Sequence, residues 1–181
     1  MLGLGNIGSR IGTLFKAFGA TVYGTSDRRK ADETIDRVFQ QANMTEAVRE
    51  ADIVICALPL TPETRGQIGR DFIAAMKPGV LLVNVSRAAV IDEDALYEAL
   101  QSGLVGGFAA DVWWKTPGRG ESISWPSAKY EFQKMENVVM SPHRAGFIEN
   151  GLPHLDGAIE NIAALIRGDS LQNQVDRRKA Y

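Results

Sequence analysis

The sequence is poor in the residues that build disulfide frameworks and metal sites. Its 181 residues include one cysteine, Cys56, and two histidines. A lone cysteine cannot form an internal disulfide, and no cluster of Cys and His has the spacing of a zinc site. We therefore expect no metal, and we expect Cys56 to be a small buried apolar residue.

Long apolar runs and a strong excess of charge are also missing. No run approaches the roughly 18 residues that a membrane span needs, and the start has no charged and then apolar leader of the secretory kind. The 20 basic side chains nearly balance the 22 acidic ones, so charge gives no reason to expect nucleic acid or an anionic membrane as a partner. These absences favour a soluble cytoplasmic protein with a single core.

What the sequence does contain is an alternation of short apolar runs with amphipathic stretches. We predict strands at 20–24, 53–58, 80–85, 105–112 and 138–140, and helices at 7–18, 45–50, 70–76, 93–102 and 150–167. Apolar strands that alternate with helices are typical of a parallel sheet with helices on both faces. The expected fold class is α/β with a doubly wound sheet. Residues 113–136 carry prolines, glycines and serines without period, which is typical of a functional loop at the edge of an active site.

The chain opens on a glycine-rich turn that leads directly into an amphipathic helix. Gly3, Gly5 and Gly8 have the spacing of a dinucleotide site. There the first glycine makes a tight turn, the second admits the pyrophosphate, and the third lets the helix pack on the strand. The next predicted strand ends near Ser26 and Asp27, where an acid that binds the ribose is expected. We therefore predict a Rossmann-like sheet that binds a dinucleotide.

The first strand of such a sheet is largely missing, because only two residues precede Gly3. A central strand needs about five apolar residues. We expect that the chain is a fragment that begins partway through a larger protein. The missing strand would leave apolar faces and unpaired backbone groups on its neighbours.

Four further segments follow in order: 51–64, 76–87, 110–113 and 137–146. Together with the glycine turn, they resemble the D-isomer-specific 2-hydroxyacid dehydrogenases over nearly the whole chain. The resemblance implies an NAD(P)-dependent oxidoreductase that moves a hydride between a nicotinamide and a small 2-hydroxy or 2-oxo acid. It also implies a dinucleotide-binding domain at 1–168, a return segment at 169–181 toward an absent substrate domain, and a homodimer formed through the nucleotide-binding domain.

The same resemblance implies two catalytic residues. Arg87 follows a predicted strand, and its planar fork suits a substrate carboxylate or keto oxygen. His143 matches the family histidine that donates a proton to the developing alkoxide, a task for which a side chain that titrates near neutral pH is suited. Asp111 resembles the aspartate beside the nicotinamide. The complete expected cofactor site is Gly3, Gly5, Asn6, Ile7, Gly8, Ser26, Asp27, Arg28, Leu58, Pro59, Thr64, Val85, Ser86, Arg87, Asp111, His143 and Gly146.

Two features depart from the family pattern. Thr116 stands where the family has a catalytic glutamate, and a threonine cannot stabilise an imidazolium by charge. Formate dehydrogenases, which need no proton relay, have glutamine there, and Glu121 in the same loop is an alternative partner for the histidine. The second departure is at the ribose, where the family acid falls on Ser26 and is followed by Asp27 and two arginines. Asp27 favours NAD and the arginines favour NADP; of the two cofactors we favour NAD.

A second function stays open at this point: a nicotinamide-binding or dimerisation module without turnover, or an inactive remnant. We expect the isolated chain to bind cofactor and to show negligible turnover. Trp113, Trp114 and Trp125 are candidates for an interface or a cap over the site, and His154 is expected to have a packing or surface role. Apolar residues at helical spacing near the end predict a helix that buries one face; they are Leu155, Ile159, Ile162, Ala163 and Ile166.

Overall fold

The computed structural model describes residues 1–115, 129–146 and 153–175. The chain forms two compact units, Met1–His143 and Arg144–Tyr181, and the domain boundary expected at residue 168 remains a prediction. Thr116, Glu121 and Trp125 lie outside the described residues, and so does the side chain of His154. In the described part of the chain, no helix is long and apolar enough to cross a membrane.

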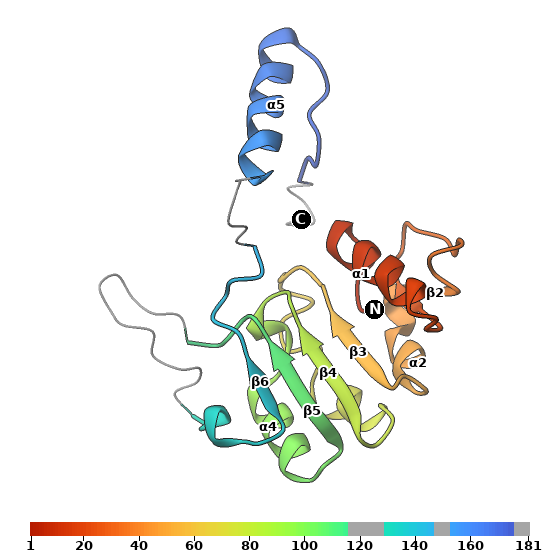
Figure 1. Cartoon of the computed structure of the whole chain (residues 1–181), viewed down its shortest axis with the longest axis vertical. Coiled ribbons are helices and arrows are strands. Elements are labelled where there is room, and N and C mark those ends of the chain that lie inside the picture. Colours follow the sequence, from red (N-terminus) through yellow and green to blue (C-terminus); the bar gives the residue numbers. More distant parts are fainter. Residues whose placement is uncertain (116–128, 147–152, 176–181) are drawn as a thin grey trace. The chain divides into compact units, whose positions relative to one another are not determined.

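The first unit alternates strands and helices, as predicted (Figure 1). Its elements are α1 (Asn6–Ala17), β1 (Tyr23–Thr25), β2 (Arg37–Phe39), η1 (Gln41–Asn43), α2 (Met44–Val48), β3 (Ile53–Cys56), α3 (Arg70–Ala74), β4 (Val80–Asn84), η2 (Ala88–Val90), α4 (Glu93–Gln101), β5 (Val105–Ala110), η3 (Phe132–Lys134) and β6 (Val138–Met140). The second unit holds α5 (Pro153–Arg167). Each predicted strand and helix is present; β6 has the predicted ends and the others have shifted ends. Strand β2 was not predicted, because it is short and begins on an exposed arginine.

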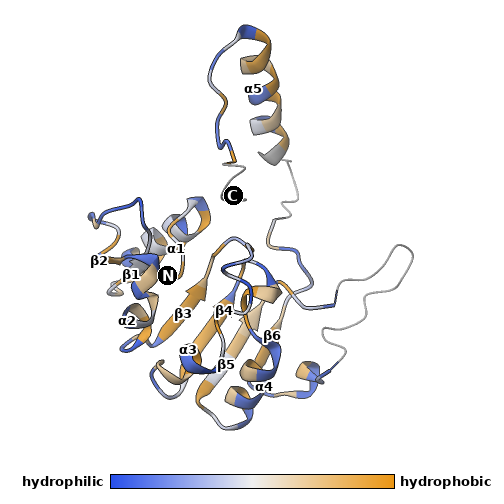
Figure 2. Ribbon diagram, turned by 180° about the vertical axis from the view of Figure 1, so that it is seen from behind, coloured by the Kyte–Doolittle hydropathy of each residue, from blue (hydrophilic) through white to orange (hydrophobic). Residues whose placement is uncertain are grey.

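The strands form two parallel sheets, one with the order β3-β4-β5-β6 and one that pairs β1 with β2. Every registered strand pair is parallel, which confirms the predicted α/β class. Helices α3 and α4 lie on the face of the larger sheet that Figure 2 turns toward the viewer, and the strands beneath them are mainly hydrophobic. Leu82, Leu96 and Phe108 are almost fully buried there.

The first residues of the chain lie against β3 as a short length of strand. Leu2 forms an isolated parallel bridge with Cys56. Its N–H donates to the Ile55 carbonyl at 2.8 Å, and its own carbonyl accepts from the N–H of Ala57 at 2.8 Å. This is the pairing expected of a central parallel strand.

On their other side, the same residues pair with β1. The N–H of Thr25 donates to the carbonyl of Met1 at 3.0 Å, and the N–H of Leu4 donates to the carbonyl of Thr25 at 3.1 Å. Residues 1–4 therefore join the two sheets. A second core cluster forms beside them from Leu4, Val22 and Ile35.

A cavity of about 380 Å³ lies next to Met1, between β1 and β3. Its lining includes Val22 from the approach to β1, Ala47 from α2, and Ile53 and Val54 from β3. The cavity is thus lined mainly by apolar side chains from the elements on either side of the chain start.

Helix α5 does not bury the face that the sequence pattern predicts. Leu155, Ile159, Ile162 and Ile166 are all exposed. Within the described part of that unit, α5 contacts the segment that follows it through hydrogen bonds between Asn161 and Gln172, and Ala164 is buried. The apolar face is exposed within this unit, and its burial against a partner stays a prediction.

The buried amino group of Met1 makes stability depend on pH. Burial lowers the pKa of this group from 8.0 to about 6, so between these values the unfolded chain binds more protons and stability rises with pH. For a chain that starts at Met1, we expect the free energy of unfolding to rise by about 2 kcal/mol across this window, relative to an Nα-acetylated chain. Urea titrations at several pH values measure the difference, and identical pH profiles for the two chains would refute it.

Candidate functional site

The predicted site residues of the first unit gather at one edge of the sheet. Because the strands are parallel, their carboxyl ends meet at a common edge, which is where ligands of open α/β sheets bind. This edge carries the glycine turn after residues 1–2, Ser26 after β1, Leu58 after β3, Arg87 after β4, Asp111 after β5 and His143 after β6. Gly146 belongs to the second unit, so it is not brought to this edge by the fold of the first.

The three glycines of the turn meet different surroundings. Gly3 has a φ of 90°, which favours glycine, and its N–H donates to Thr25 Oγ1 at 2.9 Å. A Cβ on Gly8 would lie 1.9 Å from the carbonyl oxygen of Gly3, so α1 can start this close to the turn only with glycine there. A Cβ on Gly5 would have nothing within 4 Å. Gly3 and Gly8 therefore shape the turn, and Gly5 faces open space.

The position of Gly5 is suited to an anionic group. Helix α1 begins after Gly5 and has no side-chain cap hydrogen bond. The first N–H groups of a helix attract negative charge, and an uncapped start leaves room for a ligand to approach them. Asn6 and Ile7, the other predicted members of the turn, are exposed beside it.

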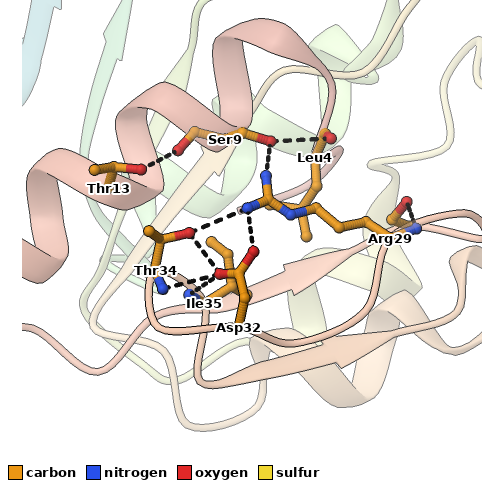
Figure 3. Close-up of polar contacts among 8 residues, drawn as sticks. Leu4, Ser9, Thr13, Arg29, Asp32, Thr34 and Ile35 are labelled. Atoms are coloured by element: carbon orange, nitrogen blue, oxygen red, sulfur yellow. Dashed lines mark hydrogen bonds and ion pairs between the residues drawn. The ribbon is translucent and has the colours of Figure 1, made fainter.

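The end of β1 holds a polar network in which the sequence analysis missed the central residue (Figure 3). The guanidinium of Arg29 donates to Ser9 Oγ, to Asp32 Oδ2 at 2.6 Å and to Thr34 Oγ1 at 3.1 Å. Hydrogen bonds from Thr34 and Arg29 hold the pKa of Asp32 well below its usual range. Arg29 was visible as one of two arginines after Asp27, but only its contact with α1 distinguishes it from Arg28.

The loop after β4 is built on Asn84, another residue that was not predicted. Asn84 is fully buried. Its Oδ1 accepts from the N–H of Ser86 at 3.0 Å and from Ser86 Oγ at 2.8 Å, while its Nδ2 donates to the carbonyl of Arg87 at 3.1 Å. Asn84 therefore sets the course of the chain through Val85 and Ser86 and leaves the Arg87 side chain exposed at the edge.

Asp111 is buried at the end of β5 and is joined to the end of β6. Ser141 Oγ donates to Asp111 Oδ1, and the indole N–H of Trp113 donates to the carbonyl of Ser141 at 3.0 Å. Two residues later, His143 is exposed and has a φ of 56°. A left-handed backbone is uncommon for residues other than glycine, although His tolerates it better than most.

Hydrogen bonds of the Thr64 hydroxyl stabilise the loop after β3. Its Oγ1 donates to the carbonyl of Pro59 at 2.7 Å and accepts from the N–H of Thr61 at 2.8 Å. Leu58 is buried and Pro59 is exposed. The Thr64 hydroxyl therefore shapes this loop at the shared edge.

Cys56 is fully buried, as predicted, and lies 3.3 Å from Ser86 Oγ through its Sγ. Burial raises the pKa of its thiol, so the group stays protonated. Trp113 and Trp114 are partly buried against Phe132, at ring centroid distances of 6.2 and 5.6 Å, which places their rings in internal packing. In the described ranges, no group of three or more His, Cys, Asp or Glu residues could hold a metal ion.

Known proteins resemble this chain along most of its length. A family model described as D-isomer-specific 2-hydroxyacid dehydrogenase, NAD-binding domain, matches residues 1–145. The chain is 34% identical to a glyoxylate reductase of Aeropyrum pernix, over 98% of this chain and 51% of that protein. It is 31% identical to a D-3-phosphoglycerate dehydrogenase of Methanocaldococcus jannaschii, over 97% of this chain and 32% of that protein.

A solved structure agrees with this likeness. The D-isomer-specific 2-hydroxyacid dehydrogenase from Xanthobacter autotrophicus Py2, in complex with NADPH and MES, is similar with a TM-score of 0.85 and 32% identity, over 99% of this chain and 71% of that one. The chain spans about half or less of the length of the two curated relatives.

Substitutions at Gly8 and Gly5 should have different effects on stability. We expect Gly8→Ala to lower the free energy of unfolding by about 1–3 kcal/mol, because backbone must move to relieve the contact with Gly3. Gly5→Asn, which keeps a preferred N-cap residue, should change it by less than about 0.5 kcal/mol. Urea unfolding measures both, and equal losses would contradict the distinction between a packed and an open glycine.

Proposed function

The chain belongs to the D-isomer-specific 2-hydroxyacid dehydrogenase family, and from this membership we propose that it forms the NAD(P)-binding part of an oxidoreductase. The proposed reaction transfers a hydride between a nicotinamide cofactor and carbon 2 of a small 2-hydroxy or 2-oxo acid. One observation carries the proposal: an open glycine turn shares a sheet edge with an exposed arginine and an exposed histidine. The glyoxylate reductase of A. pernix supports a small 2-oxo acid as substrate.

The residues of the turn fit a dinucleotide. Gly5 leaves open space above the uncapped start of α1, and backbone N–H groups in such a place bind a pyrophosphate. Ser26 and its neighbours lie at the end of the adjacent strand, where the adenine ribose of a dinucleotide is bound in folds of this type. When bound, a reduced nicotinamide supplies the hydride.

Arg87 is proposed to hold the substrate. Its guanidinium would pair with the substrate carboxylate through two parallel hydrogen bonds and would withdraw electron density from the keto oxygen. Asn84 would position it, because the side chain of Asn84 holds the backbone of the loop that presents Arg87. Asp111, fixed by Ser141, would accept a hydrogen bond from the nicotinamide carboxamide and favour the positively charged oxidised ring.

His143 is proposed to hold the proton that neutralises the developing alkoxide. Thr116 offers this imidazole no negative charge, so we propose a weaker proton relay than a carboxylate partner gives. Glu121 stays a candidate partner by its position in the same loop. Replacing a carboxylate by a neutral group removes the charge that stabilises an imidazolium, and this would lower the rate of proton transfer.

We also propose a homodimer in the cytoplasm. Exposed apolar side chains on α5 are available to a second copy of the chain, among them Ile159 and Ile166. Apolar patches of this kind mark interaction surfaces. Sedimentation should give the mass of a dimer, and the double variant Ile159→Glu and Ile166→Glu should give that of a monomer; a wild-type monomer would refute this proposal.

The proposed function is tested by binding and turnover together. We expect the 181-residue chain to bind reduced nicotinamide dinucleotide and to show negligible oxidation of it with glyoxylate, because the chain spans about half or less of the length of the two curated relatives. Gly5→Asn should weaken binding by about tenfold or more, since its side chain fills the space above the turn. Calorimetric titration gives the affinities. Undetectable binding by the folded wild-type chain, or equal binding by Gly5→Asn, would contradict the proposed site.

A further inference from the structure

The polar side chains that follow β1 point to two different sides of this strand. On one side, the backbone N–H of Gln41 donates to Asp27 Oδ1 at 2.9 Å. Gln41 begins η1 and follows β2, the strand paired with β1. The other neighbours of β1 are residues 1–4, which lead into the glycine turn. The carboxylate of Asp27 is therefore held on the β2 side, away from this turn.

Arg29 lies on the side of the glycine turn (Figure 3). Its Nη1 donates to Ser9 Oγ, and Ser9 Oγ in turn donates to the carbonyl of Leu4 at 3.1 Å. Ser9 comes directly after Gly8, the last glycine of the turn. The guanidinium is thus tied to the start of α1, beside the place where the dinucleotide phosphates are proposed to bind.

The Arg29 guanidinium retains donors for a further anion. Its contacts with Ser9, Asp32 and Thr34 use three N–H groups, whereas a guanidinium carries five. Asp32 also accepts from the N–H of Thr34 at 2.9 Å and from that of Ile35 at 3.1 Å. The arginine is therefore held in place before a ligand arrives, which reduces the entropy lost on binding.

Ser26 adds a hydroxyl donor at the same strand end. Its Oγ accepts from the N–H of Arg28 at 3.2 Å and from that of Arg29 at 3.0 Å. An oxygen that accepts two N–H groups keeps its own proton to donate. Arg28, Arg29 and Lys30 follow Asp27 directly, so three cationic side chains stand in succession at this strand end.

From these contacts we propose that the chain binds NADP(H) in preference to NAD(H), and that Arg29 is the specificity-determining residue. The guanidinium of Arg29 and the hydroxyl of Ser26 bind the 2′-phosphate of the adenine ribose. An acid at a strand end favours NAD when it accepts from the 2′-hydroxyl and repels a phosphate; here Asp27 is held by Gln41 instead. The proposal rests on the dinucleotide site proposed above.

The test compares the affinities of NADPH and NADH for the 181-residue chain and two variants. We expect NADPH to bind the wild type at least about tenfold more tightly than NADH, because each charge-assisted hydrogen bond to the phosphate adds affinity. Arg29→Ala should weaken NADPH binding by about 10- to 100-fold and leave NADH binding within about threefold. Arg70→Ala is the control, since it removes another arginine paired with a carboxylate, that of Glu98, at an exposed position outside the proposed site, and it should leave both affinities unchanged.

The possible results separate the two proposals. If neither coenzyme binds the folded chain, the proposed function fails. If NADH binds as tightly as NADPH, or more tightly, the dinucleotide site stands and the preference for NADP is overturned. An equal loss of both affinities in Arg29→Ala would also overturn the specificity role, because it would show that Arg29 only supports the turn through Ser9.

Discussion

Four residues hold the two sheets of this protein together. Residues 1–4 exchange backbone hydrogen bonds with β3 through Leu2 and with β1 through Met1 and Leu4. The glycine turn follows this short strand directly, so the positions of α1 and of the strand end at Ser26 depend on the same backbone hydrogen bonds. Parallel strands need a neighbour on each side to satisfy their backbone groups, and here a minimal length of chain provides it.

The sequence was sufficient for the architecture because its signals were local and repeated. Strand 80–85 and helix 93–102 were legible from Val- and Leu-rich runs between glycines, and the structure has them within a few residues. Strand β2 was not legible, because three residues with an exposed arginine carry no periodicity. The exposure of the apolar face of α5 could not be predicted either. A hydrophobic pattern indicates that a helix face is apolar, but it does not indicate which element packs against that face.

The residues of the candidate site likewise include some that the sequence predicted and some that it did not. Arg87 and His143 were predicted from their places in family motifs, and the parallel register brings the ends of their strands to one edge. Asn84 and Arg29 were not in the predicted set, because what they do depends on hydrogen bonds across space: one with the loop that follows it, the other with a helix twenty residues earlier in the chain. The sequence spacing of motifs therefore does not identify residues whose role is to position other residues.

The backbone conformation at His143 is one that a residue with a Cβ adopts at a cost in stability. A left-handed φ of 56° is a conformation that glycine adopts without the steric cost that a Cβ imposes. A glycine would therefore relax this turn, and a screen that selects only for thermal resistance would tend to remove the imidazole. Consensus or computational stabilisation of this chain should accordingly leave position 143 fixed, since the gain there would come at the expense of the only exposed imidazole on the sheet edge among the described residues.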